Sequence, residues 1–388
     1  MNLINDTART NSKGFLRRQM NVVERCVYFD HAAVSPIPIP ARVAMSEYLD
    51  QVGNQGDVRW GDWAKGVEIG RTRGAELLGC ESEEIALIPN TTFGINVISN
   101  GIPWRSGDNL VVPDNEFPSN LLPWRLLARR GVEVRIVPTA EHIEIDRVLE
   151  LVDSRTRLVT VSWVHYASGY RVDLAELCHR VHERGAKLFV DAIQGLGAFP
   201  LSVRQIPIDF LAADGHKWML GPEGAGILFI RKCHLDWLEP IMMGWGSVQQ
   251  AHQFSSDQVE LKNQASRYEG GSANMVGLLG FSASLGLLLE AGCHRTESGM
   301  GDEILETSRM LEEGLRRLGA IIYRDPNPIR QSGIVSFELS NHDSHRIRQS
   351  LLDQNIIVSV RNGRLRAAVH AYNDEHEVSR MLSALSGI

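Results

Sequence analysis

Short β-rich runs alternate with helical stretches between residues 84 and 231, and no other feature of the sequence constrains the fold as strongly. The runs read EIALIP, NLVVP, VEVRIVP, RLVTVSWV, KLFVDA, FLAADG and GILFIR, and helical stretches such as residues 174–184 (LAELCHRVHER) lie between several of them. Strands that are almost continuously apolar and separated by helices form mostly parallel sheets covered on both faces. We therefore predict an α/β fold with a mostly parallel sheet between layers of helices.

The pattern changes after about residue 290. A helix over 302–318, a strand over 321–324 and strands near 333–339 and 356–360 predict a smaller α+β unit. A chain of 388 residues is long enough for two domains. We predict an N-terminal segment (1–24) that is loose or peripheral over its first 20 residues, a large domain (25–290) and a small C-terminal domain (291–388).

Two further segments have compositions that predict their structure. Residues 28–40 (YFDHAAVSPIPIP) carry prolines at positions 36, 38 and 40, and because proline cannot continue a helix, we expect an extended, shaped loop. Residues 275–289 form the most apolar stretch, but it is too short to span a membrane and predicts a buried helix. The first 20 residues lack the apolar run of a signal peptide.

Charge and cysteine content narrow the class of protein. The net charge is −7 with acidic and basic residues interspersed, which argues against a nucleic acid or a membrane as partner. Five cysteines, an odd number without a CxxC pair, argue against a disulfide framework and against a structural zinc site, so no metal is predicted. A reducing, cytoplasmic compartment fits this cysteine usage best.

Several common catalytic signatures are absent from the chain. There is no GxxxxGK[ST], no GxGxxG that opens a helix, no HExxH and no GxSxG. These absences disfavour P-loop nucleotide enzymes, nicotinamide enzymes, zinc proteases and serine hydrolases of the α/β type. The Gly-rich loop at 221–226 (GPEGAG) is by itself typical of an ordinary turn.

Polar residues follow three of the expected strands, where parallel sheets bind their ligands. The first set, Asn90-Thr91-Thr92, comes before a helical stretch over 92–100. Hydroxyls and free N–H groups at a helix N-terminus suit a phosphate, although Thr is also a common helix cap. The second set is Asp191 with Gln194 (VDAIQG). A buried strand-end acid needs a cationic partner, which could be a pyridinium, an internal salt bridge or a helix cap.

The third set is His216-Lys217, directly after FLAADG. A lysine at a strand-end crevice is desolvated, which favours its neutral amine, and a neutral amine can form an imine; a solvated surface charge is the ordinary alternative. Taken in this order, the three loops supply a phosphate cradle, an acid for a ring nitrogen and an amine for an aldehyde. Pyridoxal 5′-phosphate (PLP) requires all three.

These residues resemble the class V aminotransferase-like enzymes of PLP fold type I. That group includes cysteine desulfurases, selenocysteine lyases, kynureninases and isopenicillin N epimerases. The resemblance spans about residues 25–385 and is carried by VDxxQ followed by GHK, with Asp191 and Lys217 26 positions apart. It implies that the large domain binds PLP and that Lys217 is the Schiff-base lysine. It also implies that Asp191 pairs with the pyridine nitrogen and that Gln194 lies near the ring hydroxyl.

The same resemblance assigns further cofactor and substrate residues. Thr91, Thr92 and His216 match phosphate contacts, and Phe117 stands where the family places the residue that stacks on the cofactor ring. Ser272, in YEGGSAN, matches a hydroxyl residue that reaches the phosphate of the neighbouring subunit, which implies a homodimer with shared active sites. Arg366 matches the arginine that holds the substrate carboxylate, a task suited to a bidentate guanidinium.

Departures from the family pattern bear on the reaction. Cysteine desulfurases carry a nucleophilic cysteine on a loop before the carboxylate-binding arginine, whereas residues 358–366 (VSVRNGRLR) are short and contain none. Phe117 stands where desulfurases have His, and it can stack but cannot exchange a proton. Tyr166 replaces an Asn of the desulfurases, which favours a kynureninase. Gln194 argues against a kynureninase, because kynureninases do not have Gln at that position. Asp214 replaces a phosphate-binding Ser, so we expect its carboxylate to point away from the phosphate.

An amino acid is the expected substrate, and an aminotransferase is the favoured reaction. A lyase that breaks a Cβ–S or Cβ–Se bond is the runner-up, followed by an amino-acid epimerase, because all three reactions share their first steps. The alternative outside enzymology is a PLP-fold protein used for binding or regulation.

Some residues have two interpretations at this point. His31 either lies near the substrate or makes a structural hydrogen bond. Trp60 and Trp63 either line the active site or pack in the core or an interface. Arg361 and Arg364 either bind a second carboxylate of the substrate or are solvated.

Overall fold

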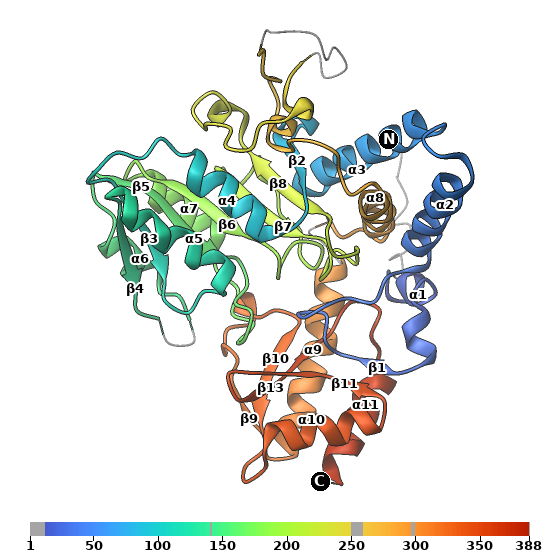
Figure 1. Ribbon diagram of the computed structural model, residues 1–388. Coiled ribbons are helices and arrows are strands. Elements are labelled where there is room, and N and C mark those ends of the chain that lie inside the picture. The colour runs from blue at the N-terminus through green and yellow to red at the C-terminus, as the bar shows by residue number, and fades with distance from the viewer. Residues whose placement is uncertain (1–11, 140–141, 250–258, 296–298, 388) are drawn as a thin grey trace, which may run out of the picture.

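The computed structural model describes residues 12–139, 142–249, 259–295 and 299–387 (Figure 1). At its centre lies a seven-stranded sheet with the strand order β2-β8-β7-β6-β5-β3-β4. The strands are β2 (Ile85–Ile88), β3 (Asn109–Pro113), β4 (Glu133–Val137), β5 (Thr156–Ser162), β6 (Lys187–Asp191), β7 (Phe210–Asp214) and β8 (Gly226–Ile230). The run from β4 to β7 is parallel, and β8 is antiparallel to both its neighbours. The prediction of a mostly parallel sheet is confirmed.

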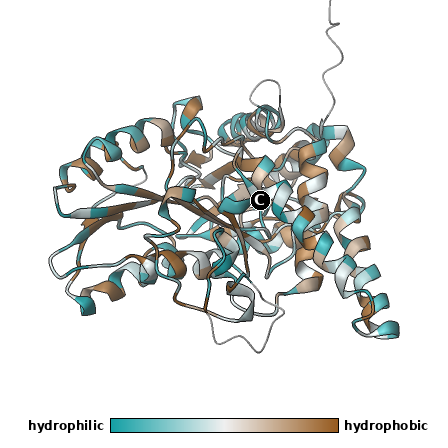
Figure 2. Ribbon diagram, turned by 90° about the horizontal axis from the view of Figure 1, so that it is seen from above, coloured by the Kyte–Doolittle hydropathy of each residue, from teal (hydrophilic) through white to brown (hydrophobic). Residues whose placement is uncertain are grey.

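Helices cover both faces of this sheet, and Figure 2 shows the apolar strands in brown between them. The large part of the chain contains α2 (Ile39–Gln55), α3 (Trp60–Leu78), α4 (Thr91–Gly101), α5 (Leu122–Leu126), α6 (Ile145–Glu150), α7 (Leu174–His182) and α8 (Met275–Glu290). Successive residues of β8 point to opposite faces. Ile227 packs in one core cluster with residues of α3, α6, α7 and α8, whereas Leu228 packs in another with residues of α4 and α5. Two-sided burial explains the uninterrupted apolar runs.

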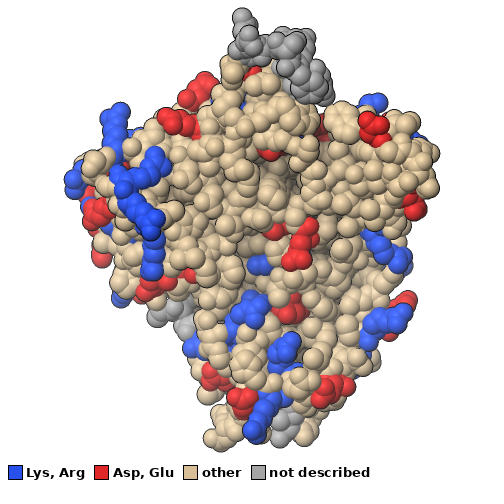
Figure 3. Space-filling model, in the orientation of Figure 1, with Lys and Arg blue, Asp and Glu red and all other residues tan. Residues whose placement is uncertain are grey.

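The stretch predicted as a buried helix is α8, and it packs against α2 and α3. Its buried side includes Leu278, Phe281 and Leu285. In the part of the chain that the structure describes, none of the helices combines the length and the apolar character needed to cross a bilayer. On the face shown in Figure 3, acidic and basic side chains are interspersed, with one group of basic side chains at the left edge.

The C-terminal part contains a four-stranded antiparallel sheet with the order β12-β13-β10-β9. Its elements are α9 (Met300–Arg317), β9 (Ile321–Ile322), β10 (Ile334–Glu338), α10 (Ser344–Asp353), β11 (Ile356–Ile357), β12 (Ser359–Arg361), β13 (Arg364–Ala368) and α11 (Glu375–Ser386). Their apolar faces form a third core cluster, which also takes in Val27 and Phe29. The division of the chain at residue 290 stays a prediction.

The stretch at 356–360 departs from its prediction. Instead of one strand it forms β11 and β12, which belong to different sheets: β11 pairs in parallel with β1 (Val27–Tyr28), and β12 pairs with β13. Val358 separates the two strands. The apolar pattern is that of a strand throughout, so only the positions of the two pairing partners decide where the backbone changes sheet.

Two predictions near the N-terminus are corrected. Residues 12–20 are not loose: α1 (Ser12–Arg17) buries Leu16 completely, and Arg17 forms ion pairs with Asp374 and Glu377. Residues 1–11 lie outside the described part. The loop predicted over 28–40 ends earlier, because α2 begins at Ile39 and places Pro40 in its first turn, where a missing N–H costs no intrahelical hydrogen bond.

Candidate active site

A cavity of about 320 Å³ lies at the carboxyl ends of β6 and β7, next to the hairpin of β12 and β13. Its lining brings together nine of the residues predicted from the sequence: Thr91, Thr92, Phe117, Tyr166, Asp191, Gln194, His216, Lys217 and Arg366. All but Arg366 lie at or just beyond the ends of β2, β3, β5, β6 and β7, and they converge because the carboxyl ends of parallel strands share one edge of the sheet. Arg366 comes from β13 of the smaller sheet.

Lys217 and Asp191 are two of the buried charged groups that line this cavity. Burial lowers the pKa of Lys217 to about 8, against the opposing charge of Asp191. Burial likewise raises the pKa of Asp191 to about 6, while the Ile193 N–H, which donates to Asp191 Oδ1 over 3.1 Å, and Lys217 oppose that rise. With a pKa of about 8, a minor fraction of the Lys217 amine is neutral near neutral pH, which is far more than for an ordinary lysine.

The N-terminus of α4 forms one end of the cavity. Asn90 caps the helix, because its Oδ1 accepts from the Phe93 N–H over 2.8 Å. Thr91 Oγ1 accepts from the Asp214 N–H over 2.9 Å, and Thr92 Oγ1 donates to Ser119 Oγ over 2.8 Å. The backbone N–H groups of Thr91 and Thr92 are the first of the helix and lack intrahelical acceptors. A helix of 11 residues with two such donors can bind a phosphate.

Asp214 is among the lining residues of the cavity and is buried, and the orientation of its carboxylate relative to a bound phosphate stays a prediction. Asp214 Oδ2 lies 3.0 Å from His216 Nδ1. Asp214 Oδ1 is buried and has no hydrogen-bond partner among the described residues. The phosphate end of the cavity therefore holds a carboxylate beside the donors that an anion needs.

Replacing Asp214 with asparagine should strengthen PLP binding and lower its Kd about threefold or more. The amide keeps an oxygen for His216 but removes a negative charge that repels the phosphate. The measurement is a titration of unloaded protein with PLP, followed by the visible absorbance of the bound cofactor. Thr92→Ala, which removes a hydroxyl near the same helix end, should weaken binding in the same assay. A weaker affinity in Asp214→Asn would show that the carboxylate helps to hold the phosphate.

Aromatic and amide side chains border the middle of the cavity. The Phe117 ring contacts the Tyr166 ring edge to face, with centroids 5.4 Å apart. Lys217 Nζ lies 5.7 Å from the centroid of the Phe117 ring. Gln194 is buried, and its amide both donates to the Ala32 carbonyl over 3.0 Å and accepts from Trp218 Nε1 over 2.8 Å. Gln194 is therefore held in one orientation and keeps one N–H for a ligand.

Two arginines from the β12–β13 hairpin close the remaining side. Arg366 is buried and donates from Nε to Ser359 Oγ, from Nη1 to the Tyr166 carbonyl and from Nη2 to Asp30 Oδ1, at 3.1, 2.7 and 3.3 Å. Each terminal nitrogen keeps one further N–H, which is the pair that a bidentate carboxylate needs. Arg361 lines the same cavity, and its Nη1 donates to the carbonyl of the preceding residue, Val360, over 2.8 Å.

Two residues with open interpretations, His31 and Arg364, lie outside this cavity. His31 is completely buried and bonds to the Ala368 carbonyl and the Tyr372 hydroxyl, which agrees with its structural interpretation and not with substrate binding. The Arg364 guanidinium lies 3.5 Å from the Tyr323 ring centroid and 3.6 Å from Glu338.

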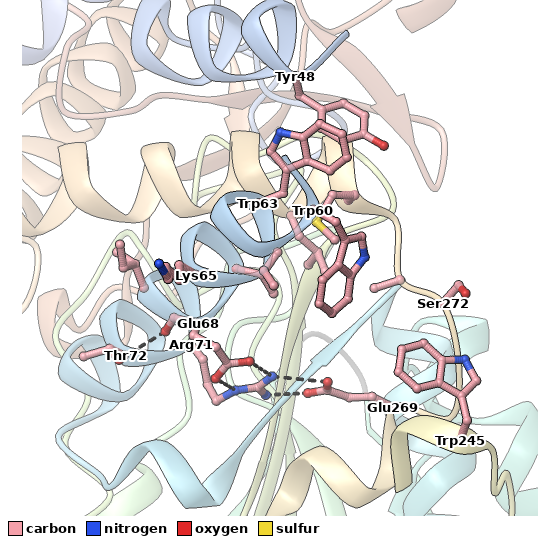
Figure 4. Close-up of a pocket in the computed structure, with 16 residues that line it drawn as sticks. Tyr48, Trp60, Trp63, Lys65, Glu68, Arg71, Thr72, Trp245, Glu269 and Ser272 are labelled. Atoms are coloured by element: carbon pink, nitrogen blue, oxygen red, sulfur yellow. Dashed lines mark hydrogen bonds and ion pairs between the residues drawn. The ribbon is translucent and has the colours of Figure 1, made fainter. Parts of the chain in front are cut away.

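Ser272, Trp60 and Trp63 lie at a different cavity of about 730 Å³. Figure 4 shows Trp60 and Trp63 near Tyr48, with Ser272 beside Trp245 on the opposite wall. Ser272 is exposed there and does not line the cavity of Lys217 in the same chain.

Comparison with known proteins agrees with this geometry. The model of the family "Aminotransferase class-V" matches residues 27–382. A "Probable cysteine desulfurase" of Methanothermobacter thermautotrophicus is 32% identical over 96% of this chain and 97% of its own length. The cystine C–S lyase C-DES in complex with its product cysteine persulfide superimposes with a TM-score of 0.87, at 25% identity over 95% of this chain and 99% of the other. A lysine-to-alanine mutant of C-DES, with glycine covalently linked to its PLP cofactor, gives a TM-score of 0.86 at 25% identity over 95% of this chain and 98% of the other.

The fold and the site together define a PLP-dependent enzyme of fold type I. The chain belongs to the aminotransferase class-V family, and its cofactor is PLP. The chemistry of the lining fits that cofactor. It offers a helix N-terminus with free N–H groups, the buried carboxylate of Asp191, the buried amine of Lys217 and the Phe117 ring, which can stack on the cofactor. The Asp214 carboxylate is the one feature of the lining that opposes it.

Proposed function

We propose that this protein is a PLP-dependent Cβ–S lyase that acts on cysteine or cystine and does not store the released sulfur on a thiol of its own. The observation that carries the proposal is the hairpin beside Lys217. Its strands β12 and β13 are joined by Asn362 and Gly363 with φ angles of 51° and 79°, which form a tight two-residue turn. None of the residues that line the cavity is a cysteine.

The five cysteines of the chain support this reading. All are free, and Cys233 is the exposed one. Cys233 follows β8, whose last residue Ile230 pairs with Phe210 at the start of β7, whereas the cavity lies beyond Asp214 at the end of β7. A nucleophilic thiolate has to reach the sulfur that leaves the substrate. The names of the relatives, a probable cysteine desulfurase and a cystine C–S lyase, also favour chemistry at a bond to sulfur.

The chain's own groups have separable roles in such a reaction. PLP, when bound, supplies an electron sink for charge that develops at the substrate Cα. The free N–H groups of Arg366 hold the substrate carboxylate, and the neutral amine of Lys217 removes the Cα proton. The Cβ–S bond then breaks, and its electron pair leaves with sulfur. With one water, cysteine gives pyruvate, ammonia and hydrogen sulfide, and cystine gives pyruvate, ammonia and cysteine persulfide.

The deciding experiment is product analysis with the PLP-loaded protein and L-cystine or L-cysteine. We expect pyruvate, ammonia and the sulfur product in equal amounts, and an unchanged rate in Cys233→Ser. Alanine as the main product would instead indicate desulfurase chemistry. A keto acid formed together with the amine form of the cofactor would indicate the aminotransferase that the sequence favoured, and inverted substrate would indicate an epimerase. No spectral change with any amino acid would favour a binding protein.

Arg361 suggests that cystine is the better substrate. Its guanidinium lies in the same cavity as Arg366, and its charge lowers the pKa values of Lys217 and Arg366. A substrate with a second carboxylate would offset this positive charge. Arg361→Ala should therefore raise the KM for cystine about tenfold and that for cysteine much less. Arg364→Ala, on the same hairpin but directed to Tyr323, is the matched control; equal effects on both substrates would contradict this assignment.

We also infer that two copies of the chain share their active sites. Ser272 is exposed at the larger cavity, whose aromatic wall includes Trp60 at 42% exposure and Trp245 at 41%. That position suits a contact with a second subunit, and a homodimer in solution would agree with it. A cytoplasmic location stays a prediction.

A further inference from the structure

Glu116 is a second buried carboxyl group close to the cofactor end of Asp191, and nothing in the proposed reaction uses it. It comes directly before Phe117 and is 6% exposed. The Ser162 N–H donates to Glu116 Oε1 over 2.6 Å, and the Ser162 hydroxyl contacts Oε2. Ser162 is the last residue of β5 and pairs in register with Asp191 at the end of β6. The carboxyl group therefore joins the loop of Phe117 to the strand beside Asp191.

No lysine, arginine or histidine in the described part of the chain forms an ion pair with Glu116. Its polar neighbours Ser162 and Asn120 are neutral, and the charged group that acts on it is Asp191, a like charge. The neighbouring Asn115 carbonyl contacts His165 Nε2 over 3.1 Å, so that imidazole is engaged with the backbone. A buried carboxylate without a cation is costly. Burial and the charge of Asp191 raise the pKa of Glu116 to about 7, while the Ser162 hydrogen bonds oppose the rise.

We propose that Glu116 is a positioning residue that works as a neutral carboxylic acid, fixing the Phe117 loop on β5 while Asp191 alone carries the negative charge beside the cofactor nitrogen. The Ser162 N–H and hydroxyl hold the two carboxyl oxygens of Glu116 through neutral hydrogen-bond partners. Two ionised carboxylates at adjacent strand ends would repel each other and would divide the interaction with a single pyridinium. This role is independent of the reaction that follows and goes beyond the proposed lyase activity.

The test compares two replacements in the full, PLP-loaded protein. Glu116→Gln keeps the shape, an acceptor for the Ser162 N–H and a neutral charge, so PLP affinity and the visible circular dichroism of the bound cofactor should stay within about twofold of the original. Glu116→Ala removes both contacts and should weaken PLP binding about tenfold and diminish the dichroism, because the Phe117 loop is released. Rescue by glutamine but not by alanine is the expected signature.

Infrared spectroscopy tests the protonation state without using activity. At about pH 6 the protein should show a carbonyl band of a buried protonated carboxylic acid that is lost in Glu116→Gln and retained in Asp191→Asn. The band should fade as the pH rises through about 7, the pKa of Glu116. If the band is absent, or if Glu116→Gln loses PLP affinity as strongly as the alanine variant, the carboxyl group is ionised and the proposal fails. Neither result depends on which substrate the enzyme takes.

Discussion

Replacing Lys217 with alanine should reduce turnover about a thousandfold or more while the protein still folds. Lys217 is the amine within the cavity, and its pKa, lowered by burial to about 8, makes it a base near neutral pH. The variant loses both the covalent attachment point of the cofactor and the group that removes the Cα proton. Removing the amine also takes away the charge that lowers the pKa of Asp191, so this buried carboxyl group should become easier to protonate. The measurements are steady-state turnover and the visible absorbance of lysine-bound cofactor.

Lys232→Ala is the control for this experiment, since Lys232 is exposed in the short turn after β8, away from the cavity. Its turnover and absorbance should match those of the original protein. If Lys217→Ala kept the absorbance of lysine-bound cofactor, another lysine would be the attachment site and the assignment of the cavity would be wrong. If it kept turnover alone, the base would have to be a different group.

The alternation of apolar runs and helical stretches was sufficient to predict the central sheet, because a strand that is buried on both faces requires an uninterrupted apolar run. The same reasoning could not separate β11 from β12, since Ile356–Ile357 and Ser359–Arg361 pair with strands far away in the sequence. It also missed α1, whose polar composition hides the burial of Leu16 against the rest of the chain. Local pattern reports which face is buried but not which distant partner buries it.

Site residues at strand ends were the most predictable, because a strand end fixes where the next side chains lie. Asp191 is the last residue of β6 and Lys217 lies in the loop after β7, and the register of the parallel sheet brings these two strand ends to one edge. The orientation of Asp214 could not be derived from the sequence, since its contact with His216 depends on side-chain conformation. Glu116 was not predicted as a site residue. The sequence shows only an acidic residue just before Phe117, and its hydrogen bond to Ser162 joins it to a strand far away in the sequence.

Asp191→Asn should lower kcat about a hundredfold or more while PLP still binds with a Kd within about tenfold of the original. The carboxylate favours the protonated pyridine nitrogen of the cofactor, and an amide of the same shape cannot supply that charge. Binding is largely retained because the phosphate cradle of α4 and the lysine are unchanged. The measurements are kcat with the best substrate and a PLP titration of the unloaded protein.

The pH dependence gives this prediction a second, independent arm. Since burial raises the pKa of Asp191 to about 6, the unloaded protein should lose the carboxylate charge as the pH falls through 6, and its affinity for PLP should fall with it. A bound pyridinium favours the ionised form, so the acid limbs of kcat and kcat/KM, which are both measured with PLP bound, should lie below pH 6. In Asp191→Asn both limbs should lose this component. Asp114→Asn, which changes an exposed acid directly after strand β3, should leave rate and profile unchanged. An Asp191→Asn variant with the original kcat would mean that the buried negative charge has no part in the reaction, and the cavity would then owe its chemistry to Lys217 and the cofactor alone.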